Sequence, residues 1–519
     1  MAVVLVDAAK AKPNEIAIRD SSLTMTWPEL NSAINRVVNN LKPRDLGPNR
    51  RIAVYSENSL ETALAHMAAL HAGLSSVPVN FHLNAEEAAY ILNDSGTRLL
   101  FTGPENLARA IEAVAQLSTP IPIVVWRASG ALPTGVESFE ALMASSSDAE
   151  PVDDVAPRPN MLYTSGTTGF PKGVDLPPTM FAGGTNIAEH IAVLATNRFA
   201  SLGVHIVVGP MYHTGPLSGV RILATGTPVV ILEKFDPERT LAKIQEFKAA
   251  SSVMVPTHFK RMLDLPADVR AKYDVSSMKM LSHTGAKCPV DVKKRMIEWF
   301  GPVFVDAYGA TEVGTVCSIT SQDWLTHPGS VGRVVNPPFT RCLVVDDDGN
   351  ELPANTEGRL FFEDATGRGI VYPNDPEKSA KAHLRPGVFT LGEIGYVDED
   401  GFVYITDRFS DMIVSGGVNI YPAEAEKVII EHPKVADVAV IGVPDPDMGE
   451  AVKALVVPID MNDAPTPEEL ITLCKSQLSG YKCPKTVDIV STVGRTAMGK
   501  INKRELRAPY WESGRTIGG

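Results

Sequence analysis

The most informative segment of this chain is Tyr163-Thr164-Ser165-Gly166-Thr167-Thr168-Gly169-Phe170-Pro171-Lys172-Gly173. Its glycines let backbone N–H groups approach an anion closely, its hydroxyl side chains add hydrogen-bond donors, and Lys172 adds a positive point charge. It is not a Walker loop, because that loop needs a Ser or Thr directly after its lysine and here Gly173 follows. Four hydroxyls, three glycines and a lysine in so short a stretch favour a phosphate-binding loop over an ordinary surface turn.

Strands and helices alternate on both sides of this loop. Short apolar runs are followed by stretches in which apolar residues recur at helical spacing. The predicted strands are 51–55, 76–79, 207–208, 228–232, 252–255 and 303–305, and the predicted helices are 60–72, 85–92 and 290–300. This alternation is typical of an α/β fold, with mostly parallel sheets flanked by helices.

The end of the chain has a different pattern. Residues 332–362 contain short strands and turns, which indicates a β-rich subdomain. Beyond residue 409 the sequence predicts a helix over 423–431 and strands over 438–441 and 454–457, followed by a Lys-rich end. We therefore predict a large N-terminal domain, residues 1–409, and a small α+β C-terminal domain, residues 410–519. A length of 519 residues fits three or so structural units, at roughly 100–200 residues each.

Composition excludes several classes of protein. Lys and Arg number 48 against 61 Asp and Glu, and the resulting net charge of −13 argues against a nucleic-acid binder. No apolar run is long enough to span a membrane, and the first residues lack the features of a signal peptide, so we expect a cytoplasmic enzyme. Five scattered cysteines without a CxxC pair disfavour a disulfide scaffold or a zinc site. The oligomeric state stays open, and a homodimer would be unsurprising.

Further motifs follow the glycine-rich loop in a fixed order. They are Pro210-Met211-Tyr212-His213, then Tyr308-Gly309-Ala310-Thr311-Glu312, then Asp407-Arg408 with Ser415-Gly416-Gly417-Val418-Asn419-Ile420-Tyr421-Pro422, and finally Gly499-Lys500-Ile501 with Arg504. Together these motifs resemble those of the adenylate-forming superfamily, which includes acyl-CoA synthetases, aryl-CoA ligases, luciferases and adenylation domains. The resemblance covers nearly the whole chain.

The resemblance implies a site for ATP and Mg²⁺. It places the Thr311 hydroxyl on the α-phosphate and Glu312, together with Thr164, on a Mg²⁺ ion that bridges phosphates. A lone carboxylate with phosphate oxygens and water suits that ion. The nucleotide-binding residues it implies are Thr164, Ser165, Gly166, Thr167, Thr168, Gly169, Lys172, Gly285, Asp306, Tyr308, Thr311, Glu393, Arg408 and Lys500.

It also implies catalytic, acyl-binding and CoA-binding groups. Lys500, on a mobile C-terminal lid, resembles the catalytic lysine of adenylation, although alone it would be read as part of a solvated basic face. The other catalytic residues implied are Thr311, Glu312 and His213. The acyl pocket would be formed by His213, Thr214, Gly215, His283 and Thr284, and CoA would meet Ser415, Gly416 and Gly417. Small residues after His213, including Gly219, suggest a roomy cavity.

Two positions depart from the family pattern. Glu393 stands where an aspartate usually holds both ribose hydroxyls, so the carboxylate is kept on a longer side chain. Ser410 stands at the hinge, where Asp or Lys is common. A hinge only has to absorb changes in φ and ψ, so serine is physically acceptable.

The implied chemistry is ATP-dependent activation of a hydrophobic carboxylic acid to an acyl-adenylate, followed by thioester formation with coenzyme A. AMP and pyrophosphate are released. The main alternative is an acid–amine ligase that uses the same adenylate. A nucleotide-binding regulator without activity is disfavoured by the intact Lys172, Glu312 and Lys500. A peptide synthetase module is disfavoured because no carrier domain follows Lys500. The identity of the acid is not readable from the sequence.

Overall fold

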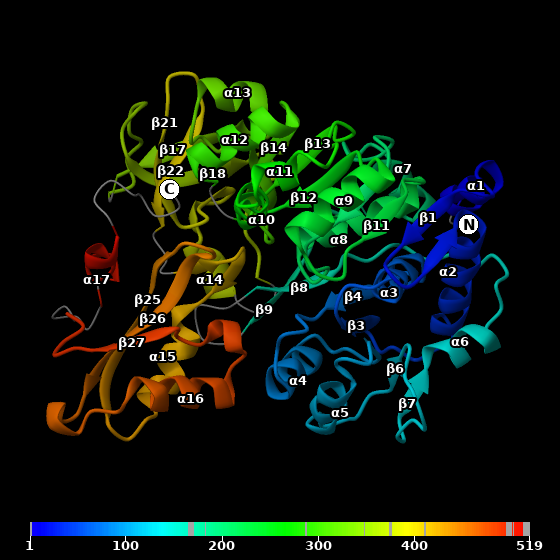
Figure 1. Ribbon diagram of the computed structural model, residues 1–519, viewed down its shortest axis with the longest axis horizontal. Helices are drawn as coiled ribbons and strands as arrows, with labels where there is room; N and C mark the ends of the chain where they lie inside the picture. The colour runs from blue at the N-terminus through cyan, green and yellow to red at the C-terminus, as the bar shows by residue number, and fades with distance from the viewer. Residues whose placement is uncertain are drawn as a thin grey trace.

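The computed structural model describes residues 3–164, 171–181, 183–285, 288–346, 348–372, 376–408, 412–494, 501 and 503–511. Within them the chain forms two large sheets flanked by helices, then a β-rich subdomain, then a C-terminal α+β unit (Figure 1). The predicted fold class, α/β with a large N-terminal part, a β-rich subdomain and a small C-terminal unit, is confirmed. The predicted domain boundary at 409/410 stays a prediction.

The first sheet is parallel throughout and has the strand order β4-β3-β5-β6-β7. Its strands are β3 (Arg51–Tyr55), β4 (Ser75–Pro78), β5 (Leu100–Thr102), β6 (Ile123–Val125) and β7 (Val136–Ser138). The helices of this part are α1 (Val3–Ala11), α2 (Trp27–Leu41), α3 (Leu60–His71), α4 (Ala85–Asp94), α5 (Leu107–Ala115) and α6 (Phe139–Ser145). Every residue of α3 is buried, as expected of a helix that is apolar on most sides and packs inside the molecule.

The second sheet has the order β16-β15-β14-β13-β12-β10-β11-β1-β2. Its strands are β1 (Ile16–Arg19), β2 (Thr24–Thr26), β10 (His205–Val207), β11 (Val229–Ile231), β12 (Ser251–Met254), β13 (Met280–His283), β14 (Phe304–Ala310), β15 (Gly314–Thr320) and β16 (Arg333–Val334). Its helices are α7 (Ile187–Leu194), α8 (Thr214–Arg221), α9 (Pro237–Phe247), α10 (Pro256–Leu263), α11 (Ala267–Arg270), α12 (Val290–Phe300) and α13 (Ser321–Thr326). Strands β10 to β14 are parallel, so their carboxyl ends share one edge.

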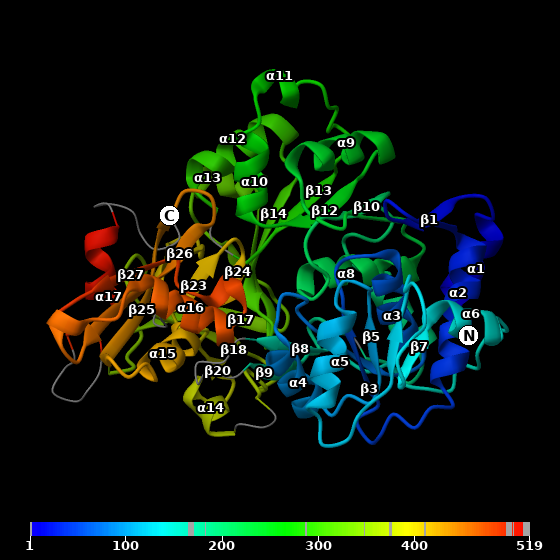
Figure 2. The same cartoon turned by 60° about the horizontal axis from the view of Figure 1, so that its bottom comes forward.

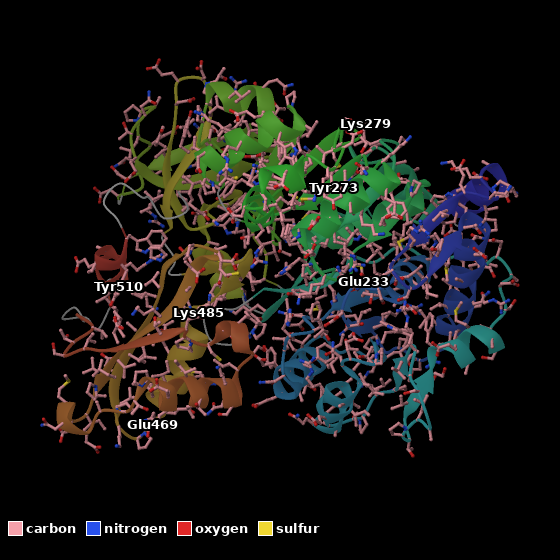
Figure 3. The ribbon with its side chains drawn as sticks, in the orientation of Figure 1. Glu233, Tyr273, Lys279, Glu469, Lys485 and Tyr510 are labelled. Carbon is pink, nitrogen blue, oxygen red and sulfur yellow. The ribbon has the colours of Figure 1, made fainter. Side chains whose placement is uncertain are left out.

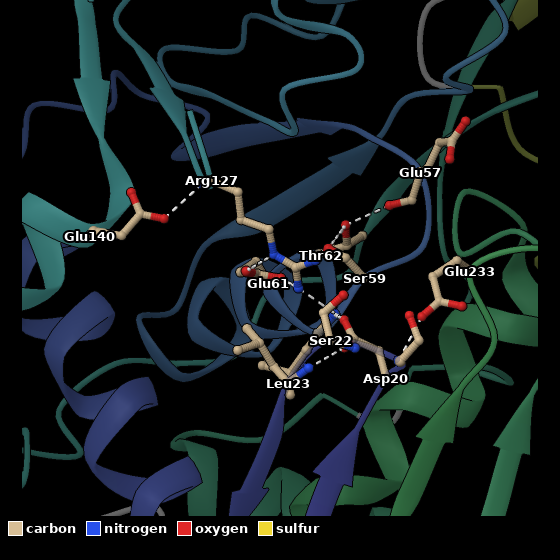
Figure 4. Close-up of polar contacts among 12 residues, drawn as sticks. Asp20, Ser22, Leu23, Glu57, Ser59, Glu61, Thr62, Arg127, Glu140 and Glu233 are labelled. Atoms are coloured by element: carbon tan, nitrogen blue, oxygen red, sulfur yellow. Dashed lines mark hydrogen bonds and ion pairs between the residues drawn. The ribbon is translucent and has the colours of Figure 1, made fainter. Parts of the chain in front are cut away.

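A partly buried ionic cluster joins the two sheets (Figure 4). Arg127, just after β6, donates to both oxygens of Glu61 at 2.7 Å and to Asp20 at 3.1 Å. Its backbone N–H donates to Glu140 at 2.7 Å. Since Asp20 follows β1 of the second sheet, while Glu61 lies on α3, the planar guanidinium fixes one sheet against the other through several charge-assisted bonds.

The β-rich subdomain follows β16. It consists of β17 (Phe339–Val345), β18 (Gly358–Asp364), β19 (His383–Arg385), β20 (Val388–Phe389), β21 (Glu393–Val397) and β22 (Val403–Arg408), with α14 (Pro376–Lys381). All its strand pairs are antiparallel. This unit is longer than the predicted 332–362, because its later strands are too short and irregular to show a clear alternation.

The C-terminal unit forms a sheet of its own, seen in orange in Figures 1 and 2. Its elements are β23 (Ile413–Ser415), β24 (Val418–Ile420), α15 (Pro422–Ile430), β25 (Val435–Asp445), β26 (Gly449–Pro458), α16 (Pro467–Gln477), β27 (Thr486–Ile489) and α17 (Lys503–Arg507). Its own polar contacts hold it together: Lys485 pairs with Asp445 at 2.9 Å, and Tyr510 donates to Asp488 at 2.6 Å. Figure 3 labels Lys485 and Tyr510.

Most predicted elements lie close to their predicted bounds, and 51–55 and 290–300 match them. Strands β25 and β26, predicted over 438–441 and 454–457, are much longer, at Val435–Asp445 and Gly449–Pro458, and β14, predicted over 303–305, continues to Ala310. Strand β14 is longer because Tyr308, Gly309 and Ala310 pair with the antiparallel strand β15, a contact that no local pattern shows. Among the described residues no helix is long and apolar enough to cross a membrane.

Candidate active site

The glycine-rich segment lies between the two strands of a hairpin. Strands β8 (Met161–Thr164) and β9 (Lys172–Asp175) are antiparallel, and Thr164 is the register partner of Lys172. Thr164 and Lys172, which flank the predicted phosphate-binding residues, are therefore neighbours across the two strands. Among the predicted phosphate contacts, the structure describes the backbone and side chain of Lys172 but only the backbone of Thr164.

The predicted metal-binding carboxylate, Glu312, is held from two sides. Its side chain is nearly buried, and Tyr372 Oη donates to its Oε1 at 3.2 Å. Arg368 donates to its backbone oxygen at 3.3 Å. The ammonium of Lys172 lies 5.9 Å and that of Lys378 4.2 Å from the centre of the Tyr372 ring. Tyr372 thus links Lys172, the predicted phosphate-binding lysine, to Glu312, and sequence reasoning missed it because its partners are far away in the chain.

These residues fit a Mg²⁺ ion that is bound mainly by phosphates. In the part of the chain that the structure describes, no group of three or more His, Cys, Asp or Glu side chains could hold a metal by itself. Glu312 is instead a lone carboxylate near a lysine, at the edge where parallel strands end. That is the arrangement expected when a nucleotide supplies most of the oxygen ligands.

The two predicted ribose contacts face each other. Glu393 begins β21 and is the register partner of Arg408 at the end of β22. Tyr308 Oη donates to Glu393 Oε2 at 2.8 Å, so the carboxylate is also tied to β14. Burial and, next, the Glu393 charge raise the pKa of Tyr308, which keeps its hydroxyl protonated and donating. The structure thus brings together three predicted nucleotide-binding residues from three strands.

Asp306 and His283 belong to a buried cluster that sequence reasoning missed in part. They are register partners on β14 and β13, and His283 Nε2 lies 2.9 Å from Asp306 Oδ1. Lys293 of α12 donates to Asp306 and lies 3.0 Å from the same His283 nitrogen. Its ammonium also lies 5.7 and 5.4 Å from the ring centres of Phe304 and Trp324. Local sequence offered no signal for Lys293, which is one of two consecutive lysines.

In this cluster the Asp306 carboxylate is charged, whereas the His283 ring is neutral. Burial alone would raise the pKa of Asp306, but His283 and Lys293 outweigh it and hold that pKa below its ordinary value. Burial lowers the pKa of His283, so its ring is neutral at pH 7. The second ring nitrogen, Nδ1, is buried without a hydrogen-bond partner among the described residues.

His213, the predicted residue at the acid's carboxylate, sits at the N-cap of α8. Asn58 fixes the segment before it: its amide donates to the Gly209 carbonyl at 2.8 Å and accepts from the Met211 backbone at 2.8 Å. Burial and, to a smaller extent, nearby His82 lower the pKa of His213 to about 4. At neutral pH this histidine is therefore an uncharged hydrogen-bonding group.

Helix α8 packs closely on the second sheet through two of its glycines. A Cβ atom at Gly215 would lie 2.9 Å from Val253 Cγ1 and 3.8 Å from Thr284 Cγ2. One at Gly219 would clash with the His205 imidazole. The expectation of a roomy cavity at these glycines is wrong, because their missing side chains are replaced by atoms of the sheet.

Aromatic rings link the His213 segment to the C-terminal unit. Phe81 packs edge-to-face on Tyr212 with ring centres 5.3 Å apart, and Tyr212 lies 4.4 Å from His213. On the other side, Phe81 lies 4.2 Å from His82, whose ring is 6.4 Å from that of Tyr481. Of these rings, only Tyr212 and His213 belong to a predicted motif.

The predicted CoA segment, Ser415-Gly416-Gly417, forms the turn between β23 and β24, here called the glycine turn. A Cβ at Gly417 would lie 3.2 Å from Val255, at the start of α10. A Cβ at Gly285, which has φ +88°, would lie 3.9 Å from the Gly417 carbonyl. Next to the turn, Arg261 of α10 donates to both oxygens of Asp447 at 3.0 and 2.7 Å. The turn therefore faces the predicted nucleotide-binding segment.

Several predicted residues lie outside what the structure describes. They are Ser165, Gly166, Thr167, Thr168, Gly169, Ser410 and Lys500, together with the side chains of Thr164 and Arg408. Thr311 and Thr284 are described, and each directly adjoins a residue of the site, Glu312 and Gly285 respectively.

Comparison with known protein families agrees with this geometry. Residues 5–367 match the AMP-binding enzyme family, and residues 424–500 match the C-terminal domain of AMP-binding enzymes. The chain belongs to the AMP-binding enzyme family. The match confirms the predicted superfamily. In this enzyme Glu312 lies within the first matched region, and the glycine turn lies between the two.

Individual relatives of this AMP-binding enzyme differ in the acceptor that their names give. It is 32% identical to the fatty acid–[acyl-carrier-protein] ligase ScoC of Streptomyces coeruleorubidus over 97% of this chain and 95% of that protein. It is also 32% identical to a feruloyl-CoA synthase of an Amycolatopsis species, over 97% of each chain. Among solved structures, the amide bond synthetase McbA of Marinactinospora thermotolerans has a TM-score of 0.81, with 27% identity over 98% of this chain and 99% of that one.

Proposed function

We propose that this AMP-binding enzyme joins a hydrophobic carboxylic acid to coenzyme A in two ATP-dependent steps. A carboxylate oxygen attacks the α-phosphorus of ATP, and the bond to pyrophosphate breaks. The thiolate sulfur of CoA then attacks the acyl carbon of the adenylate, and the carbon–oxygen bond to AMP breaks. The family match and the CoA synthases among the relatives support this reaction.

The nucleotide would lie at the carboxyl edge of β13 and β14. Glu393, held by Tyr308, would accept hydrogen bonds from the ribose hydroxyls, with Arg408 on the neighbouring strand. Lys172 and the loop before it would hold phosphates. Mg²⁺ bound through Glu312 would neutralise charge on the phosphate oxygens during transfer, a reaction in which alignment and charge neutralisation do most of the work.

The acid would enter beside His213. Because this imidazole is uncharged, it would orient the carboxylate as a hydrogen-bond donor without forming an ion pair that weakens the nucleophile. The neighbouring rings of Tyr212 and Phe81 are apolar surfaces, which favours a hydrophobic acid. The close packing of α8 at Gly215 and Gly219 confines the space for the acid to other parts of the site.

The observation that carries the proposal is the position of the glycine turn. It lies against Val255 and Gly285, and its glycines allow the C-terminal unit to approach the predicted nucleotide-binding segment this closely. We propose that the pantetheine arm of CoA reaches the adenylate along this turn. We assign this arrangement to the thioester-forming step, and rotation about Ser410 would bring Lys500 to the site for adenylation.

One observation favours a second acceptor. McbA, one of the solved structures that this chain resembles, is named an amide bond synthetase, so an amine acceptor is the alternative. The carrier-protein ligase among the relatives adds a third acceptor class to test. A homodimer and a cytoplasmic location stay predictions from the sequence.

The test is a pyrophosphate-release assay with ATP and Mg²⁺ over fatty, aromatic and alicyclic acids. The best acid is then supplied with CoA, with a panel of amines or with a phosphopantetheinylated carrier protein, and products are identified by mass spectrometry. We expect AMP formation and acyl-CoA with CoA. Faster amide formation would establish the alternative, and the absence of acid-dependent pyrophosphate release would refute the adenylate-forming function.

A further inference from the structure

We infer that Lys293 is a positioning residue for nucleotide binding, which acts through Asp306 and His283 on the strand ends that carry the nucleotide site. This inference rests on the proposed function. Lys293 belongs to no motif of the sequence, and it contacts the predicted nucleotide site only through side chains on β13 and β14, one of which, Asp306, is itself a predicted nucleotide-binding residue.

The argument begins with the topology. Helix α12 connects β13 to β14, and these two strands are parallel neighbours. Lys293 projects from the first turn of this connecting helix and contacts one residue of each strand, Asp306 and His283. A single ammonium therefore fastens the helix to both of the strands that it joins.

Lys293 contacts β13 and β14 close to the residues of these strands that are proposed to bind the nucleotide. His283 is the last residue of β13, and the next two residues are Thr284 and Gly285. Asp306 is followed on the same strand by Tyr308, whose hydroxyl holds Glu393. A shift of β13 relative to β14 would therefore move the predicted nucleotide-binding residue Gly285 relative to the proposed ribose contact Glu393.

Burial makes the cluster specific. The Lys293 side chain is 1% exposed, that of His283 5% and that of Asp306 11%. A buried lysine and carboxylate require close pairing, because each alone would carry a large desolvation cost. Phe304 and Trp324 surround the ammonium, so water cannot replace a lost partner easily. An active site keeps its geometry when the groups that support it are held in place by packing and hydrogen bonds, as Lys293 is here.

The ordinary alternative is that Lys293 only neutralises Asp306 and stabilises the fold. The two roles differ in what they predict for substrates. A purely structural lysine lowers the amount of folded enzyme and leaves the affinity of folded enzyme for ATP unchanged. A positioning lysine changes ATP affinity in enzyme that is fully folded, while the acid's apparent affinity changes much less.

The experiment uses the full-length chain with Lys293→Met and Lys293→Gln, with Lys294→Met as the matched control on an exposed position of the same helix. Because Lys293→Met removes the cation beside the buried Asp306 carboxylate and destabilises the chain, the double variant Lys293→Met/Asp306→Asn, which removes both charges, is included and compared with Asp306→Asn alone. Thermal unfolding sets a temperature at which every variant is folded. Binding of a non-hydrolysable ATP analogue is measured by calorimetry, and KM for ATP and for the best acid by pyrophosphate release.

We expect analogue binding to weaken, and KM for ATP to rise, about tenfold or more in Lys293→Met and in the double variant. The KM for the acid should stay within about twofold of wild type. Lys293→Gln, which keeps hydrogen-bond donors, should recover part of the affinity, and Lys294→Met should match wild type. Unchanged analogue affinity in folded Lys293→Met, or equal changes for ATP and acid, would overturn the inference. If wild-type enzyme bound no ATP analogue, the proposed function itself would fail, whereas normal wild-type binding beside an unaffected variant would count against the role of Lys293 alone.

Discussion

Lys482 of the C-terminal unit donates to Glu87 on α4 of the first unit at 2.8 Å, although the two residues are 395 positions apart. The same ammonium donates to Glu424 at 2.7 Å, and Ser479 also donates to Glu87. The side chains of Lys482, Glu87 and Glu424 are 5, 12 and 4% exposed. Together with Arg261 and Asp447, this ion pair holds the C-terminal unit where the glycine turn faces Gly285.

We expect Glu87→Gln to slow thioester formation several-fold while leaving adenylation near the wild-type rate. The change removes one charge from the contact between the units, and a loss of about 1.4 kcal/mol shifts an equilibrium between two arrangements tenfold. Lys482 keeps Glu424 as its partner. Pyrophosphate release and acyl-CoA formation from preformed adenylate are compared. The control is Glu86→Gln, an exposed neighbour on the same helix. Equal slowing of both half-reactions would contradict this role.

Glu312→Gln should abolish pyrophosphate release and Mg²⁺-dependent ATP binding. Glutamine keeps the contact with Tyr372 but removes the carboxylate proposed to meet the metal. ATP binding is measured by calorimetry with and without Mg²⁺. Tyr372→Phe is the matched variant, and it should lower turnover moderately because the carboxylate remains. Near-normal turnover of Glu312→Gln would show that the metal lies elsewhere.

Glu393→Ala should raise KM for ATP on the order of ten- to a hundredfold. A hydrogen bond to a charged group is worth roughly 1.5–3 kcal/mol, and this variant removes the carboxylate proposed to accept from the ribose. Tyr308→Phe, which removes only the hydroxyl that donates to Glu393, should have a smaller effect of the same kind. Unchanged ATP affinity with weakened acid affinity would place Glu393 in the acyl pocket instead.

Lys500→Ala should separate the half-reactions. If Lys500 neutralises charge only while the adenylate forms, its loss should slow pyrophosphate release by about 10²–10³. The same variant, given preformed acyl-adenylate and CoA, should make thioester at nearly the wild-type rate. Both rates are followed by quench-flow on one preparation. An equal loss in both reactions would refute the two-arrangement mechanism.

Acid should destabilise the enzyme through its buried histidines. Burial lowers the pKa of five histidines from 6.5 to about 3 or 4: His66, His71, His205, His213 and His258. As pH falls below about 6.5, these histidines take up protons in the unfolded chain but stay neutral in the folded chain. Their stabilising effect is therefore complete above that pH and is lost as pH falls, by ~1.4 kcal/mol per histidine per pH unit.

Urea unfolding between pH 7.5 and 5 measures this slope. His258, which stacks on Phe235 with ring centres 4.0 Å apart, can be replaced by phenylalanine without leaving a cavity. His258→Phe should reduce the slope by about one proton. His432→Asn provides the comparison outside this buried set. A stability that stays level down to pH 5 would mean that these rings are protonated in the folded enzyme.

Much of the architecture could be predicted from local patterns. Strand 51–55 and helix 290–300 are encoded by apolar residues at regular spacing, and glycines or prolines mark their ends. The glycine-rich loop and the ordered motifs after it were sufficient to predict the family. These signals are visible because the residues that create them are close together in the chain.

Tertiary structure decided which of those residues support one another. Nothing near Lys293, Tyr372 or Lys482 in the sequence indicates their roles, since each acts on a carboxylate that folding brings to it from another element. The glycines of α8 are a similar case, because only the packed sheet shows whether a missing side chain leaves a space or admits a neighbour. Sequence spacing reports backbone periodicity and local chemistry. The pairing of buried charges and the filling of space depend on distances between segments, and those exist only once the chain has folded.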